Sequence, residues 1–196
     1  MGGGDKALRP LVERPMIAHV IARLRPQAEC LALNANGDVT RFAPFGLPVI
    51  ADAVPDYRGP LAGILAAMAW SSLELPNAEA VVTVPSDTPF LPDDLVARLN
   101  AAAGQLPDRI VLAASRGVLH QVVGRWPVAL AGDLASFLAG GGRKVLDWAN
   151  RHTFATATFA DENLGGQAID PFFNANTPEE LLQAESWLRS TGANRS

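Results

Sequence analysis

Short apolar runs alternate with helical segments along the chain, and this alternation is the feature that most limits its fold. Four of the runs are mostly continuous: CLALNAN, PVIAD, AVVTVPSD and RIVLAAS. Strands buried on both faces of a parallel sheet have this composition, because helices cover both faces. The pattern therefore predicts an α/β fold: a doubly wound, mostly parallel sheet of the Rossmann-like type, with helices on both faces.

Helical signals lie between and after these runs. Apolar residues at helical spacing predict a helix over residues 15–28, and residues 61–73 are apolar around most of their circumference, which predicts a buried helix. A further helix is expected to begin at Pro92, since proline suits the first helical position. Thr177 and Glu180 have the spacing of a capping box and predict a last helix.

Two further runs, QVVGRW and FATATF, are strand candidates, and we expect both at an edge of the sheet, where such sheets often turn antiparallel. No linker or repeat interrupts the 196 residues, so we expect a single domain over residues 1–196. The net charge of −4 provides no general attraction to nucleic acid or to an anionic membrane.

Cys30 is the only cysteine, so the chain cannot form an internal disulfide, which favours a reducing compartment. No signal peptide begins the chain, and no uncharged apolar run is long enough to span a membrane. We therefore expect a cytoplasmic protein.

Polar residues follow three of the predicted strands at the point where each strand ends. Asn34 and Asn36 follow the first, Asp52 follows the second, and Asp87 follows the third after Pro85. Ligands of open parallel sheets bind beyond the carboxyl ends of the strands. The sequence therefore predicts a binding site at this edge, although each residue alone could serve as a loop or helix cap.

Asp87 is the strongest candidate for a metal ligand. A carboxylate at the end of a strand can hold Mg²⁺, which takes one or two carboxylates and completes its octahedron with water and phosphate oxygens. The alternative is that Asp87 caps the turn that leads into the helix at Pro92.

The chain opens with MGGGDK, whose glycines can bring backbone N–H groups close to phosphate oxygens while Lys6 supplies a positive charge. This segment has neither the GxGxxG pattern of dinucleotide binders nor the P-loop pattern, and it could equally be a flexible start. Such a loop normally follows a buried strand. Arg143 and Lys144 precede another predicted helix, where positive charge opposes the helix dipole, so they suggest an anionic partner or a solvated surface pair.

Seven stretches together resemble the molybdenum cofactor guanylyltransferases. They are MGGGDKAL, LALNAN, PVIAD, YRGPLAGILAAM, VPSDTPFLPDDL, GGGRKVL and FFNANTPEEL, and they follow the family's order over nearly the whole chain. The family's signature is similar to a first strand followed by LAGGxSxRMGGxDK and a helix. The resemblance therefore implies that this strand and the LAGG part are missing, and that the chain as written is less stable and less active than a version that carries them.

The resemblance also implies roles for individual residues. It implies nucleotide contacts at Gly2, Gly3, Lys6, Asn34, Asp52 and Asp87. Asp87 would also hold Mg²⁺, and Lys6 and Asp87 would act in catalysis. The residues that it implies near the pterin substrate are Asn174, Asn176, Arg143 and Lys144.

The implied reaction is transfer of GMP from GTP to the phosphate of molybdopterin, with release of pyrophosphate. The alternatives are the same transfer from CTP and a non-catalytic nucleotide- or cofactor-binding protein. The run PSDTPFLP is more similar to the guanylyl branch, which favours GTP. The implied partners are GTP and the molybdenum cofactor, with cofactor-inserting proteins and molybdoenzymes as further candidates, and neither nucleic acid nor a membrane.

Overall fold

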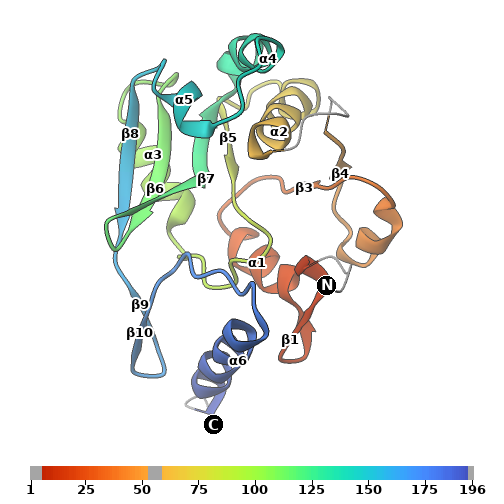
Figure 1. The fold of residues 1–196 in the computed structure, drawn as a ribbon, viewed down its shortest axis with the longest axis vertical. Coiled ribbons are helices and arrows are strands. Elements are labelled where there is room, and N and C mark those ends of the chain that lie inside the picture. Colours follow the sequence, from red (N-terminus) through yellow and green to blue (C-terminus); the bar gives the residue numbers. More distant parts are fainter. Residues whose placement is uncertain (1–5, 53–58, 194–196) are drawn as a thin grey trace.

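The computed structural model describes residues 6–52 and 59–193, and these form an α/β arrangement (Figure 1). The strands are β1 (Pro10–Leu11), β2 (Arg14–Pro15), β3 (Leu33–Asn34), β4 (Val49–Ile50), β5 (Ala80–Thr83), β6 (Ile110–Ser115), β7 (Val118–Pro127), β8 (Phe154–Phe159), β9 (Glu162–Leu164) and β10 (Gln167–Ile169). The helices are α1 (Met16–Leu24), α2 (Pro60–Glu74), α3 (Leu95–Ala103), α4 (Ala131–Ala139), α5 (Val145–Ala149) and α6 (Pro178–Ala193), with 3-10 turns η1 (Lys6–Leu8), η2 (Val39–Phe45) and η3 (Val128–Leu130). None of the helices in these ranges is long and apolar enough to cross a membrane.

Four strands form the main sheet, in the order β5-β7-β6-β8. β6 and β8 are parallel, whereas β7 is antiparallel to both of its neighbours, so the sheet is mixed. The α/β class is confirmed, but the edge position expected for QVVGRW is wrong: β7 lies inside the sheet. The two-residue turn at Arg116 and Gly117 joins β6 to β7 as a hairpin, which forces the antiparallel direction. FATATF forms β8, at the edge of this sheet and parallel to its neighbour.

Helices cover both faces of the main sheet, and the alternating side chains of β6 explain this arrangement. Ile110 and Leu112 pack in one apolar cluster with α2, α4 and α5, while Val111 and Ala113 pack in a second with α1 and α3. β6 is buried along its whole length. A continuous apolar run is therefore needed at this position.

The expected helices are present, with one shifted start. α1 and α2 confirm the two N-terminal helices, and α6 begins with the predicted capping box, in which Glu180 N–H donates to Thr177 Oγ1 at 3.1 Å. α3 begins at Leu95 instead of Pro92, because residues 92–94 form a turn closed by a hydrogen bond from Leu95 N–H to the Pro92 carbonyl.

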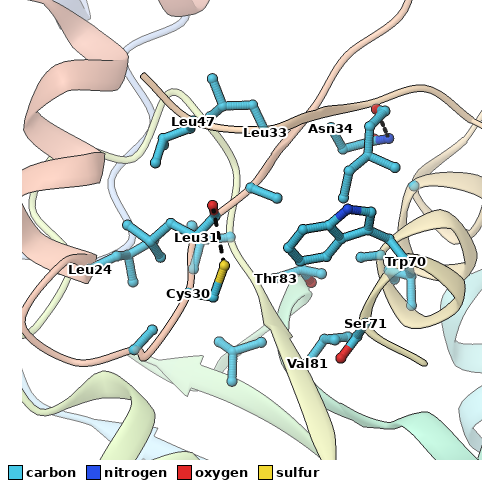
Figure 2. A pocket seen from close by; sticks show the side chains of 18 of the residues that line it. Leu24, Cys30, Leu31, Leu33, Asn34, Leu47, Trp70, Ser71, Val81 and Thr83 are labelled. Atoms are coloured by element: carbon cyan, nitrogen blue, oxygen red, sulfur yellow. Dashed lines mark hydrogen bonds between the residues drawn. The ribbon is translucent and has the colours of Figure 1, made fainter. Parts of the chain in front are cut away.

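A gap separates the main sheet from a second, parallel pair of strands, β3 and β4 (Figure 1). Within the described residues, β5 ends the order of the main sheet and β3 pairs only with β4. A cleft of about 960 Å³ lies between them, and it is lined by apolar side chains of β3, β5, α1 and α2, among them Leu33, Val81 and Ile64 (Figure 2). We refer to it as the interstrand cleft.

The walls of the interstrand cleft resemble those of an interior that lacks one layer of side chains. Every residue of β5 is only half-buried although its sequence, AVVT, is as apolar as that of the buried β6. Ser71 on α2 also lines the cleft, and its hydroxyl is buried with no hydrogen-bond partner among the described residues (Figure 2). Buried hydroxyls are normally hydrogen-bonded. The cleft therefore leaves apolar side chains and one edge of β5 without a covering layer within the described residues.

We predict that a version of the chain extended ahead of Met1 by about twenty residues, enough for one strand and a loop, melts at a higher temperature and is more active. The added strand would cover apolar walls and pair two strand edges. Cys30 lies in the wall of the cleft and is exposed, so its reaction with a thiol reagent reports filling, and the rate is expected to fall in the longer version.

The matched control for this rate is Cys30→Ser combined with Ala135→Cys, which moves the thiol to an exposed position on α4. Its rate should be the same in both versions. Equal melting temperatures, equal activity and an unchanged Cys30 rate would contradict the prediction.

Candidate functional site

Asp52 joins the polar residues that follow β3 and β4. Its Oδ1 accepts a hydrogen bond from Asn34 Nδ2 at 2.9 Å, and its Oδ2 accepts one from Asn36 Nδ2 at 2.8 Å. The Asp52 N–H in turn donates to Asn36 Oδ1 at 3.0 Å. The prediction that these side chains meet at one edge is therefore confirmed, and we call them the Asp52 cluster.

The first turn of α2 packs directly against this cluster. A Cβ atom placed on Gly63 would lie 2.4 Å from Asn34 Oδ1, so no larger residue fits without moving the asparagine. The Asn34 amide also donates to the Ile50 carbonyl at 3.0 Å, which fixes the side chain against β4 (Figure 2). The cluster is therefore a rigid rim and not a set of free loop side chains.

Asp87 lies half-buried in the turn after β5, as the sequence predicts. Its carboxylate accepts no hydrogen bond from any residue in ranges 6–52 and 59–193, so it does not cap the turn that leads into α3. Its backbone carbonyl accepts a hydrogen bond from Ala175 N–H at 3.2 Å. The carboxylate is thus held in place by its own backbone while its oxygens stay available for a ligand.

Residues 170–177, which we call the strap, bring the C-terminal asparagines to Asp87. The hydroxyl of Thr88, fully buried beside Asp87, donates to Asn174 Oδ1 at 2.7 Å. Lys6 Nζ donates to Asn176 Oδ1 at 3.1 Å. Lys6, Asp87 and the two asparagines therefore form one group, although they come from the beginning, the middle and the end of the chain.

The lining of the interstrand cleft includes two residues of the Asp52 cluster and the residue before Asp87. The cleft is apolar over most of its length, but Asn34 and Asn36 line one part of it together with Ser86, the residue before Asp87. Anionic and neutral polar groups of a ligand can thus be bound where the cleft is polar.

The remaining predicted residues do not join this group. Gly2 and Gly3 lie outside the described residues. Arg143 and Lys144 precede α5, which lies at the opposite end of the main sheet from the strap because it leads into the start of β8 (Figure 1). Arg143 donates to the carbonyls of Leu138 and Gly142. The structure therefore places these two cations apart from Asp87, and their role near the pterin substrate stays a prediction.

Residues 1–154 match the family model described as "MobA-like NTP transferase domain". The chain belongs to the MobA-like NTP transferase family. A protein of Bradyrhizobium sp. (strain ORS 278) named "Molybdenum cofactor guanylyltransferase" is 50% identical over 186 residues, which cover 94% of this chain and 85% of that protein. The family is made up of nucleotidyltransferases, in agreement with the resemblance found in the sequence.

Solved structures support the same fold. A "Molybdopterin-guanine dinucleotide biosynthesis protein A" of Archaeoglobus fulgidus superimposes with a TM-score of 0.70 at 20% identity, over 95% of this chain and 92% of that one. A Mycobacterium tuberculosis protein crystallised with manganese gives a TM-score of 0.66 at 14% identity, over 94% of each chain. The main sheet and its covering helices are therefore the fold of this MobA-like family.

Three polar residues of this MobA-like site were missed from the sequence. Thr88 is part of the run VPSDTPFLP but gave no signal of its own beyond following Asp87. Arg9 Nη1 lies 3.5 Å from the Asn176 carbonyl and adds a second cation near Lys6. Glu180 was assigned only to the capping box, yet its Oε2 also accepts the Asn176 N–H at 2.9 Å. The Thr88 and Arg9 contacts join segments distant in sequence and so leave no local pattern, whereas Glu180 lies only four residues from Asn176.

Glu180 connects the pH dependence of stability to the strap. The backbone N–H groups of Thr177 and Asn176 lower the pKa of Glu180 below its ordinary value of 4.5. A carboxyl with a lowered pKa in the folded state stabilises that state above the unfolded pKa, and the contribution is lost as the pH falls through the folded pKa. The contribution of Glu180 should therefore disappear only in acid.

We predict that Glu180→Gln lowers the melting temperature at pH 6 and that its difference from the parent chain narrows below about pH 4.5, the reference value for this carboxyl. Thermal unfolding of both chains between pH 3 and pH 6 measures this. Glu179→Gln is the matched control, because the side chain of Glu179 makes no hydrogen bond within the described residues. A Glu180→Gln difference that stays constant with pH would contradict the assignment.

Proposed function

We propose that this chain transfers GMP from GTP to the phosphate of molybdopterin and releases pyrophosphate. The observation that carries the proposal is that Lys6, Asp87, Asn174 and Asn176 meet at the strap. Ser86, the residue before Asp87, lines the interstrand cleft. The relatives' printed names and the resemblance of PSDTPFLP to the guanylyl branch support GTP and the pterin as substrates.

The reaction brings two polyanions together, so repulsion and alignment are its chief obstacles. A phosphate oxygen of molybdopterin attacks the α-phosphorus of GTP, and the bond from that phosphorus to the pyrophosphate oxygen breaks. Lys6 would stabilise the negative charge that develops on the leaving pyrophosphate. Its contact with Asn176 holds the ammonium group near the strap, where it needs no reorganisation.

Two sets of residues would each bind one of the two substrates. Asn34 and Asp52 lie on the rim formed by β3 and β4 and would bind the nucleotide. Asn174 and Asn176 lie on the strap and would bind and orient the phosphate of the pterin. Such positioning makes the reaction between the two bound substrates effectively unimolecular, which lowers its entropic cost. Gly2 and Gly3 remain predicted phosphate contacts outside the described residues.

The residues present fit a divalent cation, and we propose Mg²⁺. The Asp87 carboxylate accepts no hydrogen bond within the described residues, and these hold no cluster of three or more His, Cys, Asp and Glu residues that would favour a cage made by protein alone. Mg²⁺ typically takes one or two carboxylates and completes its shell with water and phosphate oxygens. When bound, it neutralises charge on the reacting phosphates and orients them for in-line displacement. Manganese in the M. tuberculosis structure shows only that a protein of this fold can be crystallised with a divalent metal.

Calorimetric titration of GTP, and then of CTP, with and without Mg²⁺ tests the nucleotide. We expect binding that depends on Mg²⁺ and prefers GTP. A preference for CTP would assign the cytidylyl reaction, and Mg²⁺-independent binding of both nucleotides without turnover would favour a non-catalytic binding protein.

We predict that Asp87→Ala removes metal-dependent transfer and leaves the fold intact, because the change deletes the one carboxylate assigned to the cation. Removal of one preorganised electrostatic group at a reacting centre typically costs about 10²-fold or more in kcat, and we expect a loss of at least this size. Turnover and circular dichroism of the variant measure the two parts of the prediction. Asp94→Ala is the control, since Asp94 is an exposed carboxylate near the start of α3 whose side chain caps nothing. Turnover of Asp87→Ala within a few-fold of the parent would refute the role.

A further inference from the structure

A second polar group joins the strap to the main sheet. Ser115 ends β6 and is completely buried; its Oγ lies 2.7 Å from His120 Nε2 on β7 and 2.7 Å from Asp170 Oδ1. Asp170 begins the strap, and its Oδ1 also accepts the Phe172 N–H at 2.9 Å. One hydroxyl thus joins the β6–β7 hairpin to the strap, which lies 55 residues further along the chain.

The geometry is that of an anchor and not of a nucleophile. In a Ser-His-Asp triad the histidine lies between the other two, whereas here the serine hydroxyl lies between His120 and Asp170. A hydroxyl has one proton, so Ser115 donates a hydrogen bond to the Asp170 carboxylate and accepts one from the N–H of His120 Nε2. Burial lowers the pKa of His120, which keeps the ring neutral at pH 7.

This group continues directly into the parts of the strap that meet the site. The His120 ring packs on Phe172 with centroids 4.5 Å apart, and Phe172 packs on Phe159 of β8 at 5.2 Å. Two to four residues further along the strap lie Asn174, bound to Thr88, and Asn176, bound to Lys6. Few residues separate the anchor from the asparagines, so a displacement at Asp170 has little chain over which to relax.

We propose that Ser115, His120 and Asp170 are positioning residues that fix the strap on the main sheet and thereby hold Asn174 and Asn176 in place. As a statement about catalysis this rests on the proposed function, whereas the anchoring itself does not. The group restricts the conformation of the strap, because the hydrogen bonds of a polar network away from water must all be made and only one arrangement of the strap makes them.

The central variant is Asp170→Asn, which keeps the shape of the side chain and an acceptor oxygen but removes the negative charge that strengthens the two hydrogen bonds to Oδ1. We expect kcat for GMP transfer to fall about 10- to 100-fold, the range that small misplacements of oriented groups produce, while the Kd of GTP changes less than threefold. We expect kcat and the Kd of GTP to respond differently because the Asp52 cluster, which we assign to the nucleotide, makes no described contact with the strap.

Asp133→Asn is the matched control. Asp133 on α4 also accepts two hydrogen bonds, from Trp148 Nε1 at 2.7 Å and from His152 Nε2 at 2.8 Å, but it lies at the opposite end of the main sheet (Figure 1). Its loss should lower the melting temperature without the drop in kcat. His120→Gln, which keeps a donor, should retain kcat within threefold, whereas His120→Ala should behave like Asp170→Asn.

Hydrogen–deuterium exchange of peptides covering residues 170–177 gives a readout that does not need activity. We expect at least tenfold faster exchange there in Asp170→Asn and no change in Asp133→Asn. If the parent chain transfers no GMP, the proposed function fails while this exchange still decides whether the anchor exists. Unchanged exchange in Asp170→Asn, or a fall in kcat no larger than that of Asp133→Asn, would overturn the proposal.

Discussion

β5 is the strand on which both halves of the molecule depend, because its two edges face different surroundings. One edge pairs with β7 and so belongs to the mixed main sheet. The other edge faces the interstrand cleft, across which lie β3 and the Asp52 cluster. The strand also leads, through Pro85, to Asp87. The position of β5 therefore sets the distance between the Asp52 cluster and Asp87.

The strap helps to connect the β3–β4 pair with the main sheet, which the strands themselves do not do. Within the described residues, β3 and β5 share no ladder hydrogen bonds, so polar contacts between loops connect the two parts near the site. A single such hydrogen bond contributes roughly 1 kcal/mol, and none of them alone would hold the site. They act together because they reach three consecutive residues of the strap: Thr88 binds Asn174, the Asp87 carbonyl accepts the N–H of the next residue, and Lys6 binds Asn176.

Much of this architecture could be predicted from the sequence, and the reason is periodicity. The four apolar runs each contain a strand, α1 and α2 match their patterns, and Asn34, Asn36 and Asp52 meet as strand ends of a parallel pair should. These features follow from local chemistry and from the shared edge of parallel strands. The place of β7 was not predictable in the same way, because a hairpin turn and its pairing partner leave the same apolar pattern at an edge or in the interior.

Sequence reasoning identified candidate residues of the site better than it identified the contacts between them. The FFNANTPEEL segment was assigned by resemblance, but nothing local in it shows that Asn176 meets Lys6 at a separation of 170 residues. Arg143 and Lys144 show the converse, since a reasonable argument from the helix dipole could not tell which end of the sheet their helix would occupy. A charge near a helix start is a local fact, whereas its place relative to Asp87 depends on the direction of β8.

The position of Lys6 shows why stability and chemistry are coupled here. Its neighbour Ala7 is buried against Ile17 and Phe42, in the cluster that also forms a wall of the interstrand cleft. Apolar packing therefore holds the backbone of Lys6 from one side, while Asn176 on the strap holds its ammonium group from the other. Because packing stabilises a side chain only where partner atoms fill the space around it, an underfilled cleft weakens the first of these restraints. The charge assigned to the pyrophosphate is thus positioned by apolar contacts as much as by polar ones.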